Sequence, residues 1–418
     1  MRQVLLVALG THGDVLPILA LAVELKRRGH DAVLAAPAPF ARMAERAALP
    51  FHALCTQEEY DRFTAEPDLW RPWRGAKTVF EAVSAMTEPT YRWIVGQWRG
   101  GDGVVVASTL CLGARVAQDK FALPVVTVHV MPFLVESRLA PPELPGLHLP
   151  ELLPRRLRHG IGRGADKYVI GPAALPRLNA FRATLDLPPV RRLRHWWNSP
   201  LRVLLTFSDW FAPPQLDWPR QVAQVGFPIA DHLGDTGELS PDLSSFLDAG
   251  EAPLAFTYGS AMRQSRPFFE TAVAICARMG RRGLFLAPES DQVPHRLPPG
   301  MMRVAYAPFS RVLPRCAALV HHGGVGTVAQ ALAAGIPQLV VPVAFDHFDE
   351  GRRLRRLGVG ATLGRRRFTP RRAAATIRGM LADPTLARAC AAAMTRMRAE
   401  DGVRDACDVI ERVAAGAA

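Results

Sequence analysis

The opening residues of the chain constrain its fold more than any other stretch. Residues 4–9 form an unbroken apolar run that ends at Gly10. A strand that is apolar on both faces is typical of the interior of a parallel sheet, because helices cover both sides of such a sheet. An amphipathic helical pattern follows, with apolar residues at Leu16, Leu19, Ala20 and Val23. A second apolar run covers 31–36, and strand, helix, strand is the start of a doubly wound α/β domain.

The same alternation continues in two series. The first series has further strand candidates at 104–106, 125–128 and 203–205, while 136–200 is rich in Pro and Arg and predicts mixed helices and loops. The second series has strand candidates at 254–257, 283–286, 302–305, 318–320 and 338–341. Helix-forming residues fill 373–414, which predicts two or three helices at the end of the chain.

A polar stretch, 228–253, separates the two series and predicts an interdomain connection. The length of 418 residues agrees with two or three domains at roughly 100–200 residues each. We therefore predict an N-terminal α/β domain over 1–228 and a C-terminal α/β domain over 229–400. Residues 401–418 are predicted to form a terminal helix that could pack back on the first domain.

The composition indicates the cellular location of the protein. No apolar run approaches the roughly 18 residues that a transmembrane helix needs. The first nine residues resemble a signal peptide but lead to no small-residue cleavage site, so we predict a cytoplasmic protein. The six Cys are scattered without a Cys-x-x-Cys pair, which favours reduced, buried thiols over metal ligands or disulfides.

The formal net charge of +13 favours weak attraction to anionic partners. No zinc finger or RNA-recognition signature accompanies it, and we predict no nucleic-acid partner. The run 352–372 contains nine Arg and no acidic residue. A solvated helical face explains this run without any function. The functional alternative is peripheral attachment to anionic lipid at the inner face of the cytoplasmic membrane.

The clearest chemical motif is His-His-Gly-Gly-Val-Gly-Thr at 321–327, between the strand candidate 318–320 and a helical stretch at 328–334. Glycines at such a turn let the backbone approach a ligand closely. The N–H groups at the start of the helix can then bind a phosphate. A His at this position can add a hydrogen bond or a positive charge. The alternative is a tight turn with two packed His side chains.

Residues 306–350 resemble the donor-binding signature of nucleotide-sugar-dependent glycosyltransferases of the two-Rossmann-domain, or GT-B, type. Gly-Asp-Val-Leu-Pro at 13–17 resembles their N-terminal motif, and the resemblance covers essentially the whole chain. Within that family, 206–228 and 332–349 look most similar to the rhamnosyltransferases of rhamnolipid synthesis. The resemblance implies two Rossmann-like doubly wound domains facing across a cleft, with the acceptor in the first domain and the nucleotide sugar in the second.

The resemblance implies that Asp14 is the catalytic base, which takes the proton of the acceptor hydroxyl as the bond to the sugar forms. A structural alternative is that Asp14 is the N-cap of a helix that begins at Val15, and both roles can hold together. His12 lies next to this motif, where it assists the base or lines the pocket.

The family's donor-binding residues can be carried over position by position. His322 and Gly324, with the backbone of Gly326 and Thr327, correspond to the diphosphate contacts, and Gly259 and Ser260 to a further phosphate contact. Tyr306, followed by Ala307 and Pro308, replaces the usual Trp that stacks on the base. Gln330 replaces the Glu that holds the ribose in many UDP-sugar users, which is compatible with a dTDP-sugar. Asp346 corresponds to the residue that bonds the sugar hydroxyls, and His347 replaces the usual Gln.

These residues predict an inverting glycosyltransferase that moves a sugar from a dTDP- or UDP-sugar donor. The resemblance favours L-rhamnose from dTDP-L-rhamnose and a 3-(3-hydroxyalkanoyloxy)alkanoate acceptor, which would give a mono-rhamnolipid. No Asp-x-Asp sequence occurs, and we predict no metal and no cofactor. The alternatives are a sterol, polyketide, flavonoid or carotenoid acceptor, or an inactive subunit that binds nucleotide sugar or lipid. Other partners considered are the anionic membrane and an acceptor-synthesising enzyme.

Overall fold

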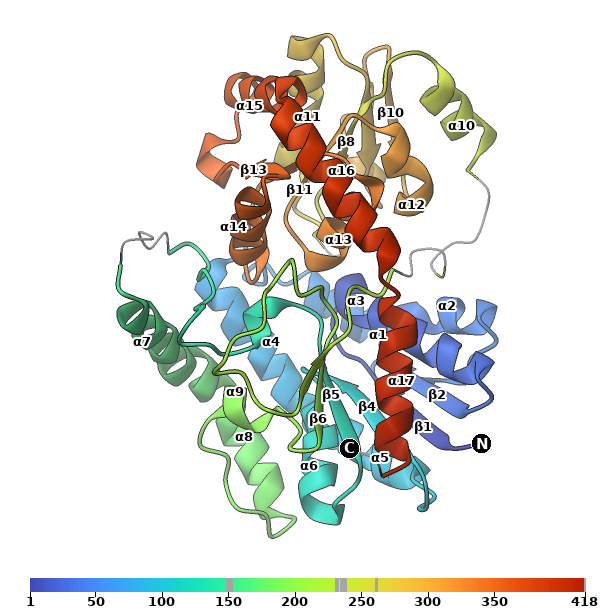
Figure 1. Cartoon of the computed structure of the whole chain (residues 1–418), viewed down its shortest axis with the longest axis vertical. Helices are drawn as coiled ribbons and strands as arrows, with labels where there is room; N and C mark the ends of the chain where they lie inside the picture. The colour runs from blue at the N-terminus through green and yellow to red at the C-terminus, as the bar shows by residue number, and fades with distance from the viewer. Residues whose placement is uncertain (148–152, 230–232, 234–238, 260–261, 417–418) are drawn as a thin grey trace. The chain divides into compact units, whose positions relative to one another are not determined.

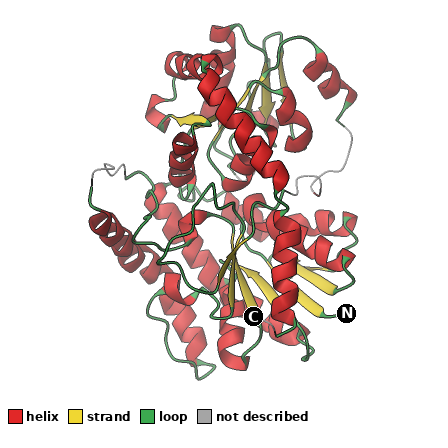
Figure 2. Ribbon diagram, viewed as in Figure 1, coloured by secondary structure: helices red, strands yellow, loops and turns green. Residues whose placement is uncertain are grey.

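The computed structural model describes residues 1–147, 153–229, 233, 239–259 and 262–416. The chain divides into two compact units (Figure 1): Met1–Ala230 together with Asp401–Ala418 form unit 1, and Asp231–Glu400 form unit 2. In each unit helices flank a sheet of parallel strands (Figure 2). Over the described residues, no helix combines the length and the apolar character needed to cross a bilayer.

Unit 1 is built on a seven-stranded parallel sheet with the order β3-β2-β1-β4-β5-β6-β7. The central pair, β1 and β4, is the point where the order of the strands reverses, and both strands are almost completely buried. The strands are β1 (Gln3–Val7), β2 (Asp31–Ala36), β3 (Phe51–Ala53), β4 (Val104–Ser108), β5 (Val125–His129), β6 (Arg202–Leu205) and β7 (Val222–Gln224).

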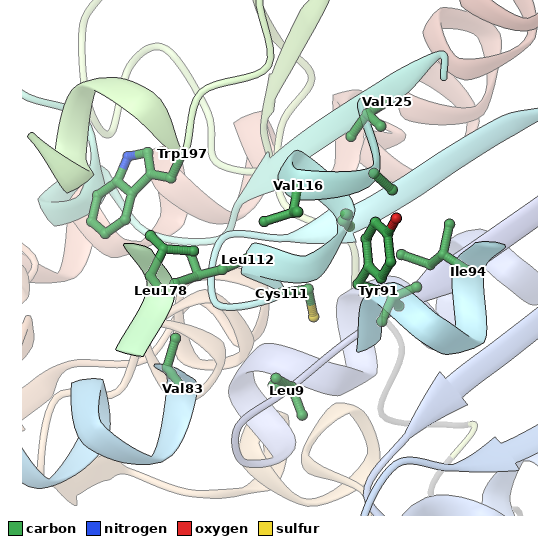
Figure 3. Packing of buried hydrophobic residues seen from close by; sticks show 14 of the residues in the cluster. Leu9, Val83, Tyr91, Ile94, Cys111, Leu112, Val116, Val125, Leu178 and Trp197 are labelled. Carbon is green, nitrogen blue, oxygen red and sulfur yellow. The ribbon is translucent and has the colours of Figure 1, made fainter. Parts of the chain in front are cut away.

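Apolar residues from the sheet and its helices form the core of unit 1 (Figure 3). Trp197 is only 1% exposed and stacks on Phe80 with a ring-centroid distance of 6.3 Å. The helices of this unit are α1 (His12–Arg27), α2 (Ala41–Arg46), α3 (Gln57–Thr64), α4 (Pro72–Ala85), α5 (Thr87–Gln97), α6 (Leu112–Phe121), α7 (Arg155–Ala165), α8 (Gly171–Ala183), α9 (Leu193–Trp196) and α17 (Gly402–Ala414).

Unit 2 repeats the design with a six-stranded parallel sheet in the order β10-β9-β8-β11-β12-β13. Its strands are β8 (Leu254–Thr257), β9 (Gly283–Leu286), β10 (Met301–Val304), β11 (Ala318–His321), β12 (Gln338–Val340) and β13 (Gly360–Thr362). Its helices are α10 (Pro241–Asp248), α11 (Arg266–Met279), α12 (Phe309–Val312), α13 (Val325–Ala334), α14 (His347–Leu357), α15 (Pro370–Ala382) and α16 (Pro384–Ala399).

Three local expectations need correction. The stretch 228–253 is not a connection throughout, because Ser240 caps α10 by accepting a hydrogen bond from the N–H of Leu243. The helix after the glycine motif begins at Val325, three residues earlier than expected, since Gly324 serves as its N-cap. The edge strands β3, β7 and β13 have only three residues each and were not anticipated, because such short runs carry little periodicity.

The Arg-rich run is not a uniformly solvated face. The guanidinium of Arg352 donates to Asp349 Oδ1 at 2.6 Å and that of Arg353 to Oδ2 at 2.8 Å. The fully buried Asp349 lies just before the run, and a buried carboxylate needs such partners to offset the cost of its desolvation. The remaining seven Arg are exposed, as a solvated surface requires.

Helix α17 packs against α1 within unit 1, and one cationic side chain pairs with acidic residues of both helices. Arg28, directly after α1, pairs with Asp408 at 2.5 Å and Glu411 at 2.8 Å in α17, and with Glu24 at 2.8 Å in α1. Its side chain is only 16% exposed. Nε2 of His30 contacts the other oxygen of Glu411 at 2.7 Å. These contacts connect residues nearly 400 positions apart.

Substitution of Arg28 by Ala therefore leaves three acidic groups without their shared cation. We expect a loss of about 1–3 kcal/mol in the free energy of unfolding, measured by urea denaturation. Arg27→Ala is the matched control, because Arg27 is 73% exposed and pairs only with Glu24 in the contacts described here. That variant should be as stable as the wild type within the error of the measurement, because an exposed ion pair contributes little. Equal losses for the two variants would contradict the anchoring role of Arg28.

Candidate functional site

Each sheet places part of its predicted functional residues where the strand order reverses. In unit 1 the loop after β1 leads to Asp14, next to the end of β4, where the N–H of Leu9 donates to Ser108 Oγ at 3.3 Å. In unit 2 the loop after β8 contains Gly259, and the loop after its neighbour β11 contains His322. In open α/β sheets, ligands bind beyond the carboxyl ends of the strands at this reversal point.

Asp14 is held by the start of the helix to which it belongs. The N-cap of α1 is Thr11, and its N–H and hydroxyl both donate to Asp14 Oδ2, at 2.9 and 3.4 Å. Asp14 is thus the third helical residue, reaching back as in a capping box, and the expectation that it is the N-cap itself was wrong. Oδ1 has no hydrogen-bond partner among the described residues. One oxygen fixes the carboxylate and the other is free to accept a proton.

The electrostatic surroundings of Asp14 suit a base. Desolvation raises the pKa of its carboxyl to about 6, against the opposing effect of the two hydrogen bonds from Thr11. The carboxylate lies directly over Gly10, which has a φ of +123°. A Cβ at this glycine would lie 2.3 Å from Asp14 Oδ2. The glycine that ends the first apolar run is therefore required both by the backbone conformation and by the space for Asp14.

Aromatic residues lie beside the base. The ring of His12 meets Phe40 edge-on at a centroid distance of 5.0 Å, and Phe40 meets Tyr60 of α3 at 6.3 Å. Burial lowers the pKa of His12 below its usual value, and its Nδ1 is buried without a partner in the described part of the chain. Burial, with a smaller effect of the negative charge of Asp14, raises the pKa of Tyr60. Sequence reasoning missed Phe40 and Tyr60, which no motif marks.

In unit 2 two glycines surround the ring of His322. A Cβ at Gly259 would lie 3.3 Å from His322 Nε2, and a Cβ at Gly324 would lie 2.5 Å from the same atom. Gly324 is also the N-cap of α13, whose first N–H groups, from Val325 to Thr327, have no carbonyl partner within the helix. The arrangement leaves backbone donors and an imidazole edge where a phosphate could be bound.

The two adjacent His residues have different environments. His321 Nδ1 accepts from the N–H of Gly323 at 3.1 Å, so its Nε2 carries the proton and donates to Gln338 Oε1 at 3.0 Å. Both ring nitrogens of His321 therefore have hydrogen-bond partners, and His321 is a residue of the core. Nδ1 of His322 is buried without a partner among the described groups, and burial lowers the pKa of His322 to about 4. In the free chain His322 offers a neutral N–H group, not the positive charge considered from the sequence.

His347 contacts His322 directly. The two rings meet edge-to-face at a centroid distance of 4.7 Å and an angle of 84°. Nδ1 of His347 receives long hydrogen bonds from the N–H groups of Val343 and Ala344, at 3.4 and 3.3 Å. The ring of His347 thus supports His322 and the loop after β12. This structural role is additional to the place predicted for His347 in the donor site.

Asp346 is the N-cap of α14 and only 5% exposed. It follows Phe345, a non-glycine residue at a φ of +51°, a strained conformation that occurs preferentially at functional loops. One turn further along α14, Glu350 is fully buried, and neither carboxyl oxygen has a partner among the described residues. Burial and the negative charge of Asp346 raise the pKa of Glu350 well above its usual range. No sequence signal indicated this second carboxyl group.

The remaining predicted donor residues lie on unit 2. Tyr306 follows β10 and is 43% exposed, while Ala307 and Pro308 are buried and lead into α12. Gln330 lies on α13, and its Oε1 is buried without a partner in the described structure. Ser260 lies outside the described residues. Gly326 and Thr327 occupy the second and third positions of α13.

Among the residues described, no group of three or more His, Cys, Asp or Glu side chains could hold a metal ion.

Two protein-family models match separate parts of the chain. Residues 4–139 match the N-terminal domain of glycosyltransferase family 28. Residues 285–410 match the C-terminal domain described as erythromycin biosynthesis protein CIII-like. The first match contains Asp14 and the second contains His322 and Asp346.

Relatives extend the match over the whole chain. O-mycaminosyltylonolide 6-deoxyallosyltransferase of Streptomyces fradiae is 32% identical, covering 98% of this chain and 97% of its own. The solved kitacinnamycin glycotransferase has a TM-score of 0.72 at 20% identity over 99% of both chains. A spinosyn rhamnosyltransferase solved with thymidine diphosphate has a TM-score of 0.68 at 19% identity, covering 98% of this chain and all of its own.

The fold is therefore that of the GT-B glycosyltransferases, and the predicted fold class is confirmed. The chain belongs to the glycosyltransferase family that includes the 6-deoxyallosyltransferase, and it is a nucleotide-sugar-dependent glycosyltransferase. A special similarity to the rhamnosyltransferases of rhamnolipid synthesis is not among these findings.

The predicted role of Asp14 as the base, combined with the pKa of its carboxyl, gives an expected pH dependence of catalysis. A base that ionises at about 6 is protonated, and inactive, below that pH. We expect kcat/KM to rise about tenfold per pH unit below 6 and to level off above it. Asp14→Asn, which can still accept from the N–H of Thr11, should lower the plateau roughly 10²–10⁴-fold and abolish the acidic limb. If the acidic limb of the pH profile were unchanged in Asp14→Asn, the limb would have to come from the ionisation of another group.

The small space between Gly324 and the ring of His322 predicts that a side chain at residue 324 would collide with this ring. Gly324→Ala keeps an ordinary φ of −62° but brings a methyl group into the ring of His322. We expect about tenfold weaker binding of thymidine diphosphate by calorimetry, which corresponds to about 1.4 kcal/mol. Gly364→Ala is the matched control, since Gly364 is also an N-cap, has a φ of −58° and has open space around it. Equal affinities of the two variants would exclude this region from the diphosphate site.

Proposed function

We propose that the enzyme transfers a 6-deoxyhexose, with L-rhamnose as the first candidate, from a thymidine diphosphate donor to a hydroxyl group of an apolar acceptor with inversion at the anomeric carbon. The observation that carries the proposal is Asp14, a carboxylate with one oxygen held by Thr11 and the other free. Its raised pKa makes it a stronger base than an ordinary Asp while it stays ionised at neutral pH.

In the proposed reaction the acceptor oxygen attacks the anomeric carbon and gives its proton to Asp14 Oδ1. The bond between that carbon and the diphosphate oxygen breaks, and the electron pair leaves with the nucleoside diphosphate. The N–H groups at the start of α13 and the imidazole of His322 stabilise the departing charge. A bound diphosphate would favour protonation of His322, whose pKa is low in the free chain.

Two observations support a thymidine diphosphate donor. Gln330 presents a buried, unpartnered oxygen where many UDP-sugar users of the family carry a carboxylate for the ribose. A neutral amide in place of a carboxylate suits a deoxyribose, which has one hydroxyl fewer. The spinosyn rhamnosyltransferase of the same fold was solved with thymidine diphosphate, and the Streptomyces relative is named for transfer of a 6-deoxy sugar.

The acceptor has two candidates. Similarity to the rhamnosyltransferases of rhamnolipid synthesis favours a 3-(3-hydroxyalkanoyloxy)alkanoate. The Streptomyces relative, 32% identical, is named for an acceptor of the tylonolide type, which favours a polyketide. Both acceptors present a hydroxyl on an apolar body. The partly exposed ring of Tyr60, which packs on the buried Phe40 beside His12, offers an apolar contact of that kind.

The test is a transfer assay with purified protein, dTDP- and UDP-activated sugars, and both acceptor classes, with products identified by mass. We expect turnover with a dTDP-6-deoxyhexose and at least tenfold lower kcat/KM with the matching UDP-sugar. Preference for a UDP-sugar would overturn the donor assignment. Turnover of only one acceptor class would decide between the lipid and the polyketide.

We further propose that transfer needs no divalent metal, because the N–H groups of α13 and His322 act on the diphosphate. The same assay with excess chelator should retain full activity. A loss that added magnesium or manganese restores, and sodium chloride does not, would overturn this part of the mechanism.

A further inference from the structure

Helix α7 lies at the edge of unit 1 (Figure 1). It presents an apolar stripe to solvent. Leu157 is 52% exposed and Tyr168, in the π-helical turn Asp166–Ile170 that continues α7, is 71% exposed. Ile161 lies between them. Spacings of four and seven residues place all three side chains on one side of a continuous helix. We call these three residues the α7 stripe.

A row of cations runs beside the α7 stripe. Arg156, Arg163 and Lys167 have the same spacings of seven and four residues, are all exposed, and form no ion pair in the described structure. The ammonium of Lys167 lies 5.0 Å from the centroid of the Tyr168 ring. Helix α7 contains no acidic residue. The charge beside the stripe is therefore uncompensated along its length.

The opposite side of the helix is attached to the rest of unit 1. Nε2 of His159 lies 3.6 Å from Glu136, and Asp166 accepts from Arg194 Nε at 2.7 Å. These two residues are seven positions apart and fix which side of α7 faces inward. The orientation that exposes Leu157 and Tyr168 is thus fixed by these two side-chain contacts, and it does not result from a loosely held helix.

We propose that the α7 stripe and its cation row form a docking surface for an anionic lipid bilayer. Apolar side chains flanked by Arg and Lys on one helix are the pattern of helices that lie in the membrane interface. Tyr is suited to this depth, because its ring is apolar and its hydroxyl reaches water. The long stems of the cations can lie along the apolar layer while their charges contact lipid phosphates. The uncompensated charge selects a negatively charged surface as the occupant.

The test is co-sedimentation of the full chain with vesicles of phosphatidylcholine alone or mixed with phosphatidylglycerol, at physiological salt. Wild-type protein should bind the mixed vesicles and not the neutral ones. Replacement of Arg156, Arg163 and Lys167 by Gln should weaken binding roughly tenfold or more. Leu157→Ser combined with Tyr168→Ser should also weaken it, although the charge is unchanged. Because these side chains are exposed, the melting temperatures should stay near that of the wild type.

The matched control replaces the exposed Arg365, Arg366 and Arg367 of unit 2 by Gln, with the same change in net charge. It should bind vesicles like the wild type. An equal loss in both triple variants would mean that only the overall charge matters and would overturn the proposal. Absence of wild-type binding, or full binding by the Leu157 and Tyr168 variant, would overturn it as well and would leave a protein partner as the occupant to seek.

Discussion

Parallel strands that are covered on both faces decide where chemistry can take place in this chain. Such strands need helices on each side, so the connecting loops gather at the two ends of the sheet. The loops after β1 and β4 lie together in unit 1, and those after β8 and β11 in unit 2. Every residue assigned here to proton transfer or diphosphate binding depends on this single constraint of the backbone.

In the proposed mechanism one side chain, Asp14, meets both the requirements of its helix and those of the reaction. Its reach back to Thr11 satisfies the first turn of α1 and also sets the carboxylate in place before a substrate arrives. Desolvation then adjusts its basicity. A group fixed by the folding of its own helix loses little entropy when it acts, which is the general advantage of preorganised catalytic groups.

The parts of this structure that could be predicted from the sequence are those encoded locally. The buried strands, the glycine loop of His322 and the motif of Asp14 all follow from contiguous residues. Phe40 and Tyr60 could not be found in this way, because tertiary packing brings them beside His12. Glu350 lies only one turn after Asp346, but its burial without a partner depends on tertiary packing, which no local pattern shows. The early start of α13 was missed for a different reason: glycine is a weak helix former, yet Gly324 is favourable as the N-cap and leaves space for the ring of His322.

The return of the last helix to the first unit makes unit 1 discontinuous in the chain. During synthesis the whole of unit 2 is made before α17 exists, so the three acidic partners of Arg28 are completed only at the end of translation. Unit 2 is in this sense an insertion into unit 1. A chimera that exchanges donor specificity between relatives should therefore graft 231–400 as an internal segment and keep the native terminal helix, since a simple fusion at residue 230 would join α1 to a foreign partner.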